Sequence, residues 1–201
     1  MIYEEFSLSN QYSIIFIGSG IANLTCALEL SKNTNKEIII LEAGSENYDK
    51  LSKSYFEGEL SGENYHDLTD CRYRGFLGSA NLWYGWCKPM FENVLKTWNI
   101  EELNNKKYFN QTVNFLNLDE NFRSSEVLSK YENFQIKYCD VKSLNKNLKR
   151  KIYNDQKIKV ILNTQVLSID KNENSYDLNI IQNNKKKKNK YKFFNSWSWV
   201  F

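Results

Sequence analysis

Two short apolar runs near the start of the chain flank a helical pattern. The first run, Ile14–Ile17, ends in the Gly-Ser-Gly turn Gly18–Gly20, and the second, Ile38–Leu41, closes on an acidic residue. Their order predicts a strand, a turn, a helix and a second strand. Because the first run is apolar on both faces, we expect it to be a central strand of a parallel sheet. Between the runs, apolar residues recur on one helical face: Ile21, Leu24 and Leu28.

The rest of the chain shows weaker patterns. Residues 45–70 are polar, and we expect a loop there with one short helix. Residues 101–118 should be mostly helical, and residues 141–155 should form a basic helix. The apolar face of that helix consists of Val141, Leu144, Leu148 and Ile152. Short strands are predicted at three places: 160–162, 166–169 and 176–181.

Composition and charge exclude several classes of protein. The chain has 201 residues and a net charge of +3, which does not by itself indicate a nucleic-acid partner. Its N-terminus lacks the apolar segment of a signal peptide, and no apolar run has membrane-spanning length, so we expect a cytoplasmic protein. The 4 cysteines are scattered, which favours free thiols over a disulfide framework or a metal site.

The Gly18–Gly20 turn has the form that holds the pyrophosphate of a dinucleotide. Gly18 allows the tight turn, Ser19 follows it, and Gly20 lets the backbone come close to a phosphate at the start of the helix. Glu42, at the end of the second strand, can accept hydrogen bonds from ribose hydroxyls and would repel a 2′-phosphate. Asn23 replaces the third glycine, so its amide must find a partner or push the helix outward. The alternative is an α/β domain whose turn binds no ligand.

A second signal lies in residues 72–90, where glycines alternate with aromatic residues. Small residues let backbone approach a flat ligand, and aromatic residues give that ligand rigid walls. Arg72 and Arg74 could meet phosphate. The alternative is an aromatic loop that packs on its own core.

This segment resembles the glucose–methanol–choline (GMC) family of FAD-dependent oxidoreductases. A bacterial branch of that family carries the motif R-x-R-x-x-G-G-[ST]-S-N-x-W-x-G-W-C-x-P-L. Leu77 and Ala80 depart from the motif, and Leu82 stands where some members have a histidine bonded covalently to flavin. The resemblance therefore implies noncovalent FAD. The matching residues are Arg72, Arg74, Gly78, Ser79, Asn81, Trp83, Gly85, Trp86, Cys87 and Pro89.

The resemblance also implies the domain organisation and further cofactor contacts. We expect an incomplete Rossmann-like FAD-binding domain of the FAD/NAD(P)-binding α/β fold, with Gly78, Asn81 and Trp83 near the flavin. Val166, within the pattern N-x-x-V-x-x-I, would contact adenine, although an ordinary strand valine is an equal alternative. The segments are 12–98 for the FAD-binding domain (βαβ unit 13–44, flavin loop 72–90), 99–155 for the start of an α+β substrate domain, and 156–184 for a returning β-meander.

Residues 185–201 do not fit this family. A lysine run is normally a solvated tail, and the ending NSWSWVF has no pattern. Codons chosen for residues 193–201 and read one base later give FLILGAGF, which is close to the family's F-I-L-G-A-G-G. We therefore expect a frameshift near Lys185–Lys190, an out-of-frame tail and a truncated chain.

The function implied by the resemblance is oxidation of the CH–OH group of a small alcohol or sugar by hydride transfer to FAD. The family's catalytic histidine pair lies in its C-terminal half, and His66 precedes the substrate domain, so we assign no catalytic residue and no metal ligand. Whether the chain is itself an enzyme stays open. The alternatives are a nonfunctional truncated product and a dinucleotide-binding module without catalysis.

Overall fold

The computed structural model describes residues 2–3, 14–47, 50–63, 66–88, 97–98, 106–118, 136–171, 176–182 and 185–191. The chain divides into two compact units, Met1–Leu82 with Asn147–Phe201, and Trp83–Lys146. Each unit is described by itself. Pro89 and the predicted tail beyond residue 191 lie outside the described residues.

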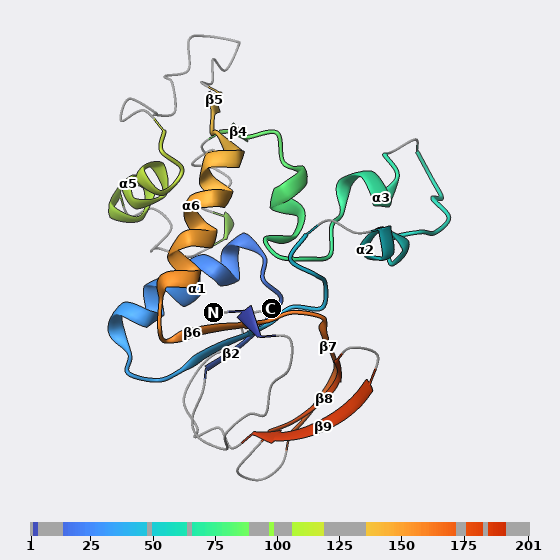
Figure 1. The fold of residues 1–201 in the computed structure, drawn as a ribbon. Helices are drawn as coiled ribbons and strands as arrows, with labels where there is room; N and C mark the ends of the chain where they lie inside the picture. Colours follow the sequence, from blue (N-terminus) through green and yellow to red (C-terminus); the bar gives the residue numbers. More distant parts are fainter. Residues whose placement is uncertain are drawn as a thin grey trace. The chain divides into compact units, whose positions relative to one another are not determined.

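A parallel sheet forms the centre of the first unit (Figure 1). Helix α1 (Ile21–Asn33) connects two neighbouring strands of that sheet, so the predicted βαβ unit is confirmed. The strand that follows α1 is buried at every position, as expected of a parallel strand covered on both faces. The strand order is β1 (Ile2–Tyr3), β6 (Ile158–Ile161), β3 (Ile38–Leu41) and β2 (Ile14–Ile17).

The prediction that β2 is a central strand is wrong. Among the described residues β2 pairs with β3 alone and stands at the edge of the sheet, where Ile17 is 42% exposed. The central position belongs to β3, because β6 pairs with its other side. An apolar run predicts burial but does not say which strand from a distant part of the chain will come to lie beside it.

A second, antiparallel sheet contains β7 (Thr164–Lys171), β8 (Tyr176–Gln182) and β9 (Lys185–Tyr191). Strands β7 and β8 were predicted, with shorter bounds. The lysine run that forms β9 was expected to belong to a solvated tail. In the structure its backbone pairs with β8, where Lys187 stands opposite Ile180 and Asn189 opposite Leu178. Figure 1 shows this sheet on the opposite side of the parallel sheet from α1. The core between the sheets consists of Ile39, Leu41, Ile161, Leu178 and Ile180, with Ile15 and Val166 packed against it.

In the described part of the chain, three short helices follow β3. The polar stretch 45–70 contains two helices, α2 (Lys50–Ser54) and α3 (Leu68–Cys71), where one was predicted. A 3-10 helix, η1 (Gly78–Leu82), follows in the predicted flavin loop. None of the helices in the described ranges combines the length and the apolar character that crossing a membrane requires.

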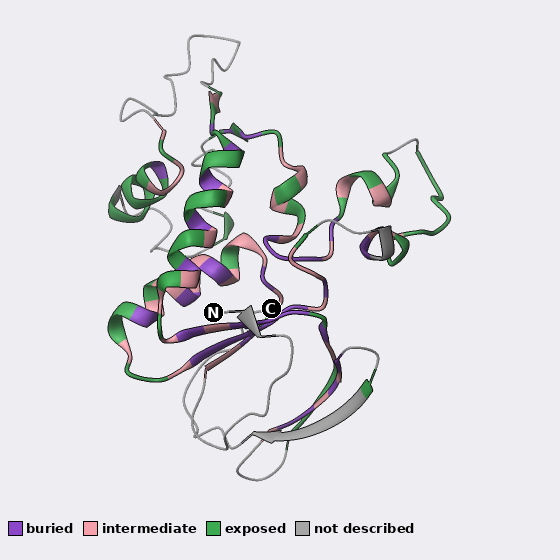
Figure 2. Ribbon diagram, viewed as in Figure 1, coloured by how far each residue is buried: buried purple, intermediate pink, exposed green. Residues whose placement is uncertain are grey.

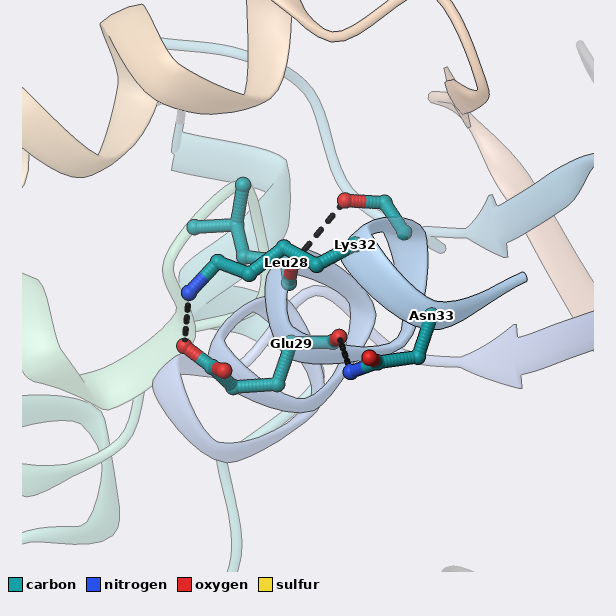
Figure 3. A network of polar contacts seen from close by, with 5 residues as sticks. Leu28, Glu29, Lys32 and Asn33 are labelled. Carbon is teal, nitrogen blue, oxygen red and sulfur yellow. Dashed lines mark hydrogen bonds and ion pairs between the residues drawn. The ribbon is translucent and has the colours of Figure 1, made fainter. Parts of the chain in front are cut away.

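Polar contacts hold the last turn of α1 (Figure 3). Lys32 pairs with Glu29, and the Asn33 amide donates to the Glu29 carbonyl oxygen at 3.1 Å. From the β6 side of the chain, the Lys157 ammonium donates to the carbonyl oxygens of Ser31 at 2.7 Å and Thr34 at 2.8 Å. A cation at a helix C-terminus satisfies carbonyl groups that have no partner within the helix.

The second unit contains helix α5 (Lys106–Phe115) and a pair of antiparallel strands, β4 (Trp86–Cys87) and β5 (Lys137–Tyr138). Gly85 lets these strands approach, because a Cβ at this position would lie 2.2 Å from the Cys139 carbonyl oxygen. Cys87 and Cys139 are buried free thiols, as predicted, and burial raises the pKa of each.

Helix α6 (Val141–Asn154) confirms the predicted basic helix. Its first residues belong to the second unit and its last residues to the first unit. The alternation of buried and exposed positions along the helix is visible in Figure 2. All four residues of the predicted apolar face are buried: Val141, Leu144, Leu148 and Ile152.

Candidate functional site

The glycine turn ends β2 and begins α1. Gly18 has a φ of +88°, a conformation that favours glycine. Gly20 is different, because its φ of −63° and ψ of 158° suit any residue, and a Cβ added there would meet nothing within 4 Å. The protein's own packing therefore does not require glycine at position 20. The missing side chain leaves open space beside the first N–H groups of α1.

Glu42 is turned toward this glycine turn. Its side chain is buried, and its Oε2 accepts hydrogen bonds from the Ser19 backbone N–H at 2.7 Å and the Ser19 hydroxyl at 2.6 Å. Its Oε1 accepts a hydrogen bond from the Gly44 N–H at 2.8 Å. The carboxylate thus fixes the turn to the carboxyl end of β3, since bonds to a charged acceptor are among the stronger ones.

The predicted flavin loop lies across the same turn. The Leu77 N–H donates to the Ser19 carbonyl oxygen at 3.1 Å, and Leu77 forms an isolated parallel bridge with Gly20. A Cβ built on Gly78 would lie 3.6 Å from the Gly20 Cα, so these two glycines face each other closely. We call the resulting arrangement the glycine cradle; it consists of Gly18–Gly20, Glu42, Gly44 and Leu77–Gly78.

Gly44 allows the flavin loop to reach the cradle. A Cβ at Gly44 would lie 2.4 Å from the Arg74 carbonyl oxygen and 2.6 Å from the Gly75 Cα. Beside it, the Phe76 N–H donates to the Ser45 carbonyl oxygen at 3.0 Å. The loop is therefore held by backbone contacts that leave no room for a side chain at position 44.

Leu77 departs from the GMC motif and has an unusual backbone. Its φ of 73° lies in the left-handed region, where the family motif has a glycine. For a residue with a Cβ this conformation costs about 1–2 kcal/mol. Leu77 is also buried, so the apolar contact of its side chain offsets part of this cost.

Asn23 stands where the fingerprint has its third glycine, and its side chain bonds to the glycine turn. Its amide donates to the carbonyl oxygens of Ile17 at 2.9 Å and Gly18 at 3.0 Å. Two outcomes were expected for Asn23, a partner for the amide or an outward shift of the helix, and the structure shows the first. At this position the helix is attached to the turn by hydrogen bonds in place of the close packing that a glycine allows.

Two other predicted residues have structural contacts. The Asn81 amide donates to the carbonyl oxygens of Phe76 at 2.8 Å and Gly78 at 3.0 Å, so it closes the flavin loop on itself. Trp83 belongs to the second unit, where its indole N–H donates to the Trp86 carbonyl oxygen at 3.3 Å. Their predicted contacts with flavin stay predictions.

Val166 lies on β7 opposite Ile180, and its side chain packs against the core between the sheets. The start of β7 is joined to the cradle through backbone bonds. The Thr164 N–H donates to the Glu42 carbonyl oxygen at 2.8 Å, and the Asn163 N–H donates to the Gly44 carbonyl oxygen at 3.0 Å. The predicted adenine contact of Val166 stays a prediction as well.

The two arginines of the motif make contacts within the protein. The Arg74 guanidinium lies 3.7 Å from the centroid of the Tyr55 ring, a cation–π contact. An Arg72 Nη1 donates to the neighbouring Cys71 carbonyl oxygen at 3.1 Å. Neither of these contacts links an arginine to the residues of the cradle.

A polar cluster next to the cradle was not predicted. The Tyr153 hydroxyl donates to Glu46 Oε1 at 2.8 Å, and Lys149 pairs with the same oxygen. The hydrogen bond from Lys149 is the main reason that the pKa of Glu46 is lowered, while burial and Glu46 raise the pKa of Tyr153. The Tyr153 ring also lies 5.9 Å from that of Phe76. In the sequence, the four-residue spacing on a helix links Lys149 to Tyr153, but no signal links them to Glu46.

Comparison with known proteins does not identify a family. No protein-family model matches the sequence, and no curated protein sequence matches it. A p-nitrophenol 4-monooxygenase, PnpA from Pseudomonas putida DLL-E4, is similar with a TM-score of 0.41 and 13% identity over 92% of this chain and 40% of its own. FqzB is similar with a TM-score of 0.38 and 14% identity, over 88% of this chain and 34% of FqzB. L-amino acid deaminase from Proteus vulgaris is similar with a TM-score of 0.36 and 10% identity, over 94% of this chain and 47% of the deaminase.

This chain spans less than half the length of each of these proteins. Similarity at such low scores identifies neither a family nor a function. The function must therefore be argued from the cradle itself. The cradle combines the uncapped start of α1 with one buried carboxylate, that of Glu42.

Proposed function

We propose that the glycine cradle binds the ADP part of FAD noncovalently. The observation that carries this proposal is Gly20, where glycine is required neither by the backbone conformation nor by neighbouring atoms. A missing side chain at the start of a helix is explained if a phosphate must come close to the backbone.

The residues present fit such a ligand. Helix α1 begins at Ile21 without a side-chain cap, so its first N–H groups have no partner within the helix. These groups and the helix dipole favour a pyrophosphate. Glu42 follows β3 and contacts the glycine turn through Ser19, and there a ribose hydroxyl can donate to its carboxylate. A 2′-phosphate would be repelled there, which favours FAD over NADP-type ligands.

We further propose that the chain is part of a flavin-dependent oxidoreductase of GMC type that oxidises the CH–OH group of a small alcohol or sugar. This rests on the motif in residues 72–87 and is supported by the position of its Gly78 beside Gly20. Bound FAD would supply the hydride acceptor. The residues of this chain bind and orient that group, and we assign none of them as the base.

The test of FAD binding compares two glycine variants of the full chain. Gly20→Ala adds a Cβ in open space and should unfold at the temperature of the wild type, yet its affinity for FAD, followed by flavin fluorescence, should fall at least about tenfold because the Cβ blocks the phosphate. Gly58→Ala is the matched control, since its Cβ also meets nothing within 4 Å and Gly58 is far from the cradle in sequence. Equal affinity of Gly20→Ala and wild type would contradict the proposal.

The oxidoreductase part needs a separate experiment. The FAD-loaded chain is mixed anaerobically with primary alcohols and sugars, and the absorbance of oxidised flavin is followed. Bleaching by one of these compounds supports the reaction class. A chain that binds FAD but is bleached by none of them has FAD binding as its own activity, and the reaction class then lacks support from this chain.

A further inference from the structure

Ser19 occupies much of the hydrogen-bonding capacity of Glu42. An ionised carboxylate offers about four acceptor positions, two on each oxygen. Both positions on Oε2 are taken by Ser19, one by its backbone N–H at 2.7 Å and one by its hydroxyl at 2.6 Å. On Oε1, the Gly44 N–H takes one position at 2.8 Å. Among the described residues no further donor to this carboxylate is present, so one position remains, on Oε1.

The Ser19 hydroxyl has little choice of acceptor. Its other neighbour, the Gly75 carbonyl oxygen, is 3.4 Å away, whereas Glu42 Oε2 is at 2.6 Å. Ser19 is fully buried, so water does not compete with Glu42 for its hydroxyl. The bond to Glu42 therefore persists unless the turn itself opens.

We propose that Ser19 makes Glu42 recognise a single hydroxyl of the adenosine ribose. This inference rests on the proposed function, because it concerns the ribose of the same nucleotide. A ribose has two neighbouring hydroxyls, and a carboxylate with both oxygens free can accept from both. Here Oε2 is saturated, so only one ribose hydroxyl finds an acceptor, at Oε1. Ser19 is thus a specificity-determining residue that limits how the ribose is read.

The test measures binding of ADP, 2′-deoxy-ADP and 3′-deoxy-ADP to the full-length chain by calorimetry. For the wild type, one of the deoxy analogues should bind within about twofold of ADP, and the other at least about tenfold more weakly, since a bond to a charged acceptor is lost. In Ser19→Ala a position on Oε2 becomes available. Both deoxy analogues should then bind this variant more weakly than ADP does.

Three outcomes would overturn the inference. In the wild type, both analogues could lose affinity about tenfold, or both could bind as ADP does; in Ser19→Ala, the wild-type preference could persist. If Ser19→Ala does not fold, as judged by thermal unfolding, the wild-type comparison alone decides. A wild-type chain that binds neither ADP nor FAD would contradict the proposed function itself, and the inference with it.

Discussion

Substitution of Gly44 by alanine tests how the flavin loop is held against the cradle. The new Cβ would lie 2.4 Å from the Arg74 carbonyl oxygen, and real Cβ atoms essentially never come closer than 3.0 Å to such a neighbour. The backbone must therefore move by about 0.6 Å, the difference between these distances. The contacting atoms belong to the main chain, so no side-chain rotation can relieve the contact.

The expected cost follows from three contributions. Overpacking that shifts backbone costs about 1–3 kcal/mol. The neighbouring hydrogen bond from Phe76 to Ser45 moves with the loop, and weakening it costs up to about 1 kcal/mol. Replacing glycine by alanine returns about 0.4–1 kcal/mol through the unfolded chain. We expect a net loss of about 2 kcal/mol, which corresponds to a decrease in Tm of roughly 4–8 °C for a chain of this size.

Thermal unfolding followed by circular dichroism measures this change. Gly58→Ala is the control, because Gly58 is exposed, has an ordinary φ and has no atom within 4 Å of the added Cβ. It should keep the Tm of the wild type or raise it slightly. Equal Tm values for the two variants would refute the close approach of the loop to position 44.

Three further substitutions test other contacts. The pKa of Glu46 is held below its ordinary value of 4.5, chiefly by the hydrogen bond from Lys149, so its contribution to stability is present above pH 4.5 and is lost as the pH falls through the lowered pKa of the folded state. The stability difference between wild type and Glu46→Gln in urea should therefore shrink as the pH is lowered from neutral into that range, and a difference that is constant with pH would contradict this. Lys157→Met removes two bonds to the carbonyl end of α1 and should cost about 1–2 kcal/mol in urea unfolding, whereas Lys36→Met, at an exposed lysine nearby in sequence, should be neutral; equal losses would argue against the cap. Asn23→Ala removes two hydrogen bonds from the side-chain amide to the glycine turn and should lower the free energy of unfolding in urea by about 1 kcal/mol. An unchanged urea midpoint would show that these hydrogen bonds contribute nothing to stability.

The elements that could be predicted from the sequence are those specified by nearby residues. The βαβ unit follows from two apolar runs and a helical repeat, and α6 follows from four apolar residues at one spacing. In the cradle, the positions of Gly18, Gly20 and Glu42 were predicted from the fingerprint spacing. These features depend on periodicity and on glycine conformation, both of which can be read locally.

The remaining features depend on pairing between distant segments. The edge position of β2 results from the pairing of β3 with β6, which is far away in the sequence. The pairs β1–β6 and β4–β5 also join distant residues, and a strand of two residues is too short to show a hydrophobic period. The lysine-rich composition of residues 185–191 does not predict a strand, because β9 forms only by pairing with β8. The inward turn of Glu42 toward Ser19 depends on side-chain geometry that spacing does not specify.

Among the described residues β2 stands at the edge of its sheet, a position that would couple the proposed nucleotide binding to strand pairing. Within the described residues β2 pairs on one side with β3, and the glycine turn begins directly after its last residue. A strand added to the other side of β2 would order Ile14–Ile17 and hence the turn that follows. A nucleotide in the cradle would order the same residues from their other end. Strand addition and nucleotide binding would therefore favour each other, and by thermodynamic reciprocity the factor would be the same in both directions.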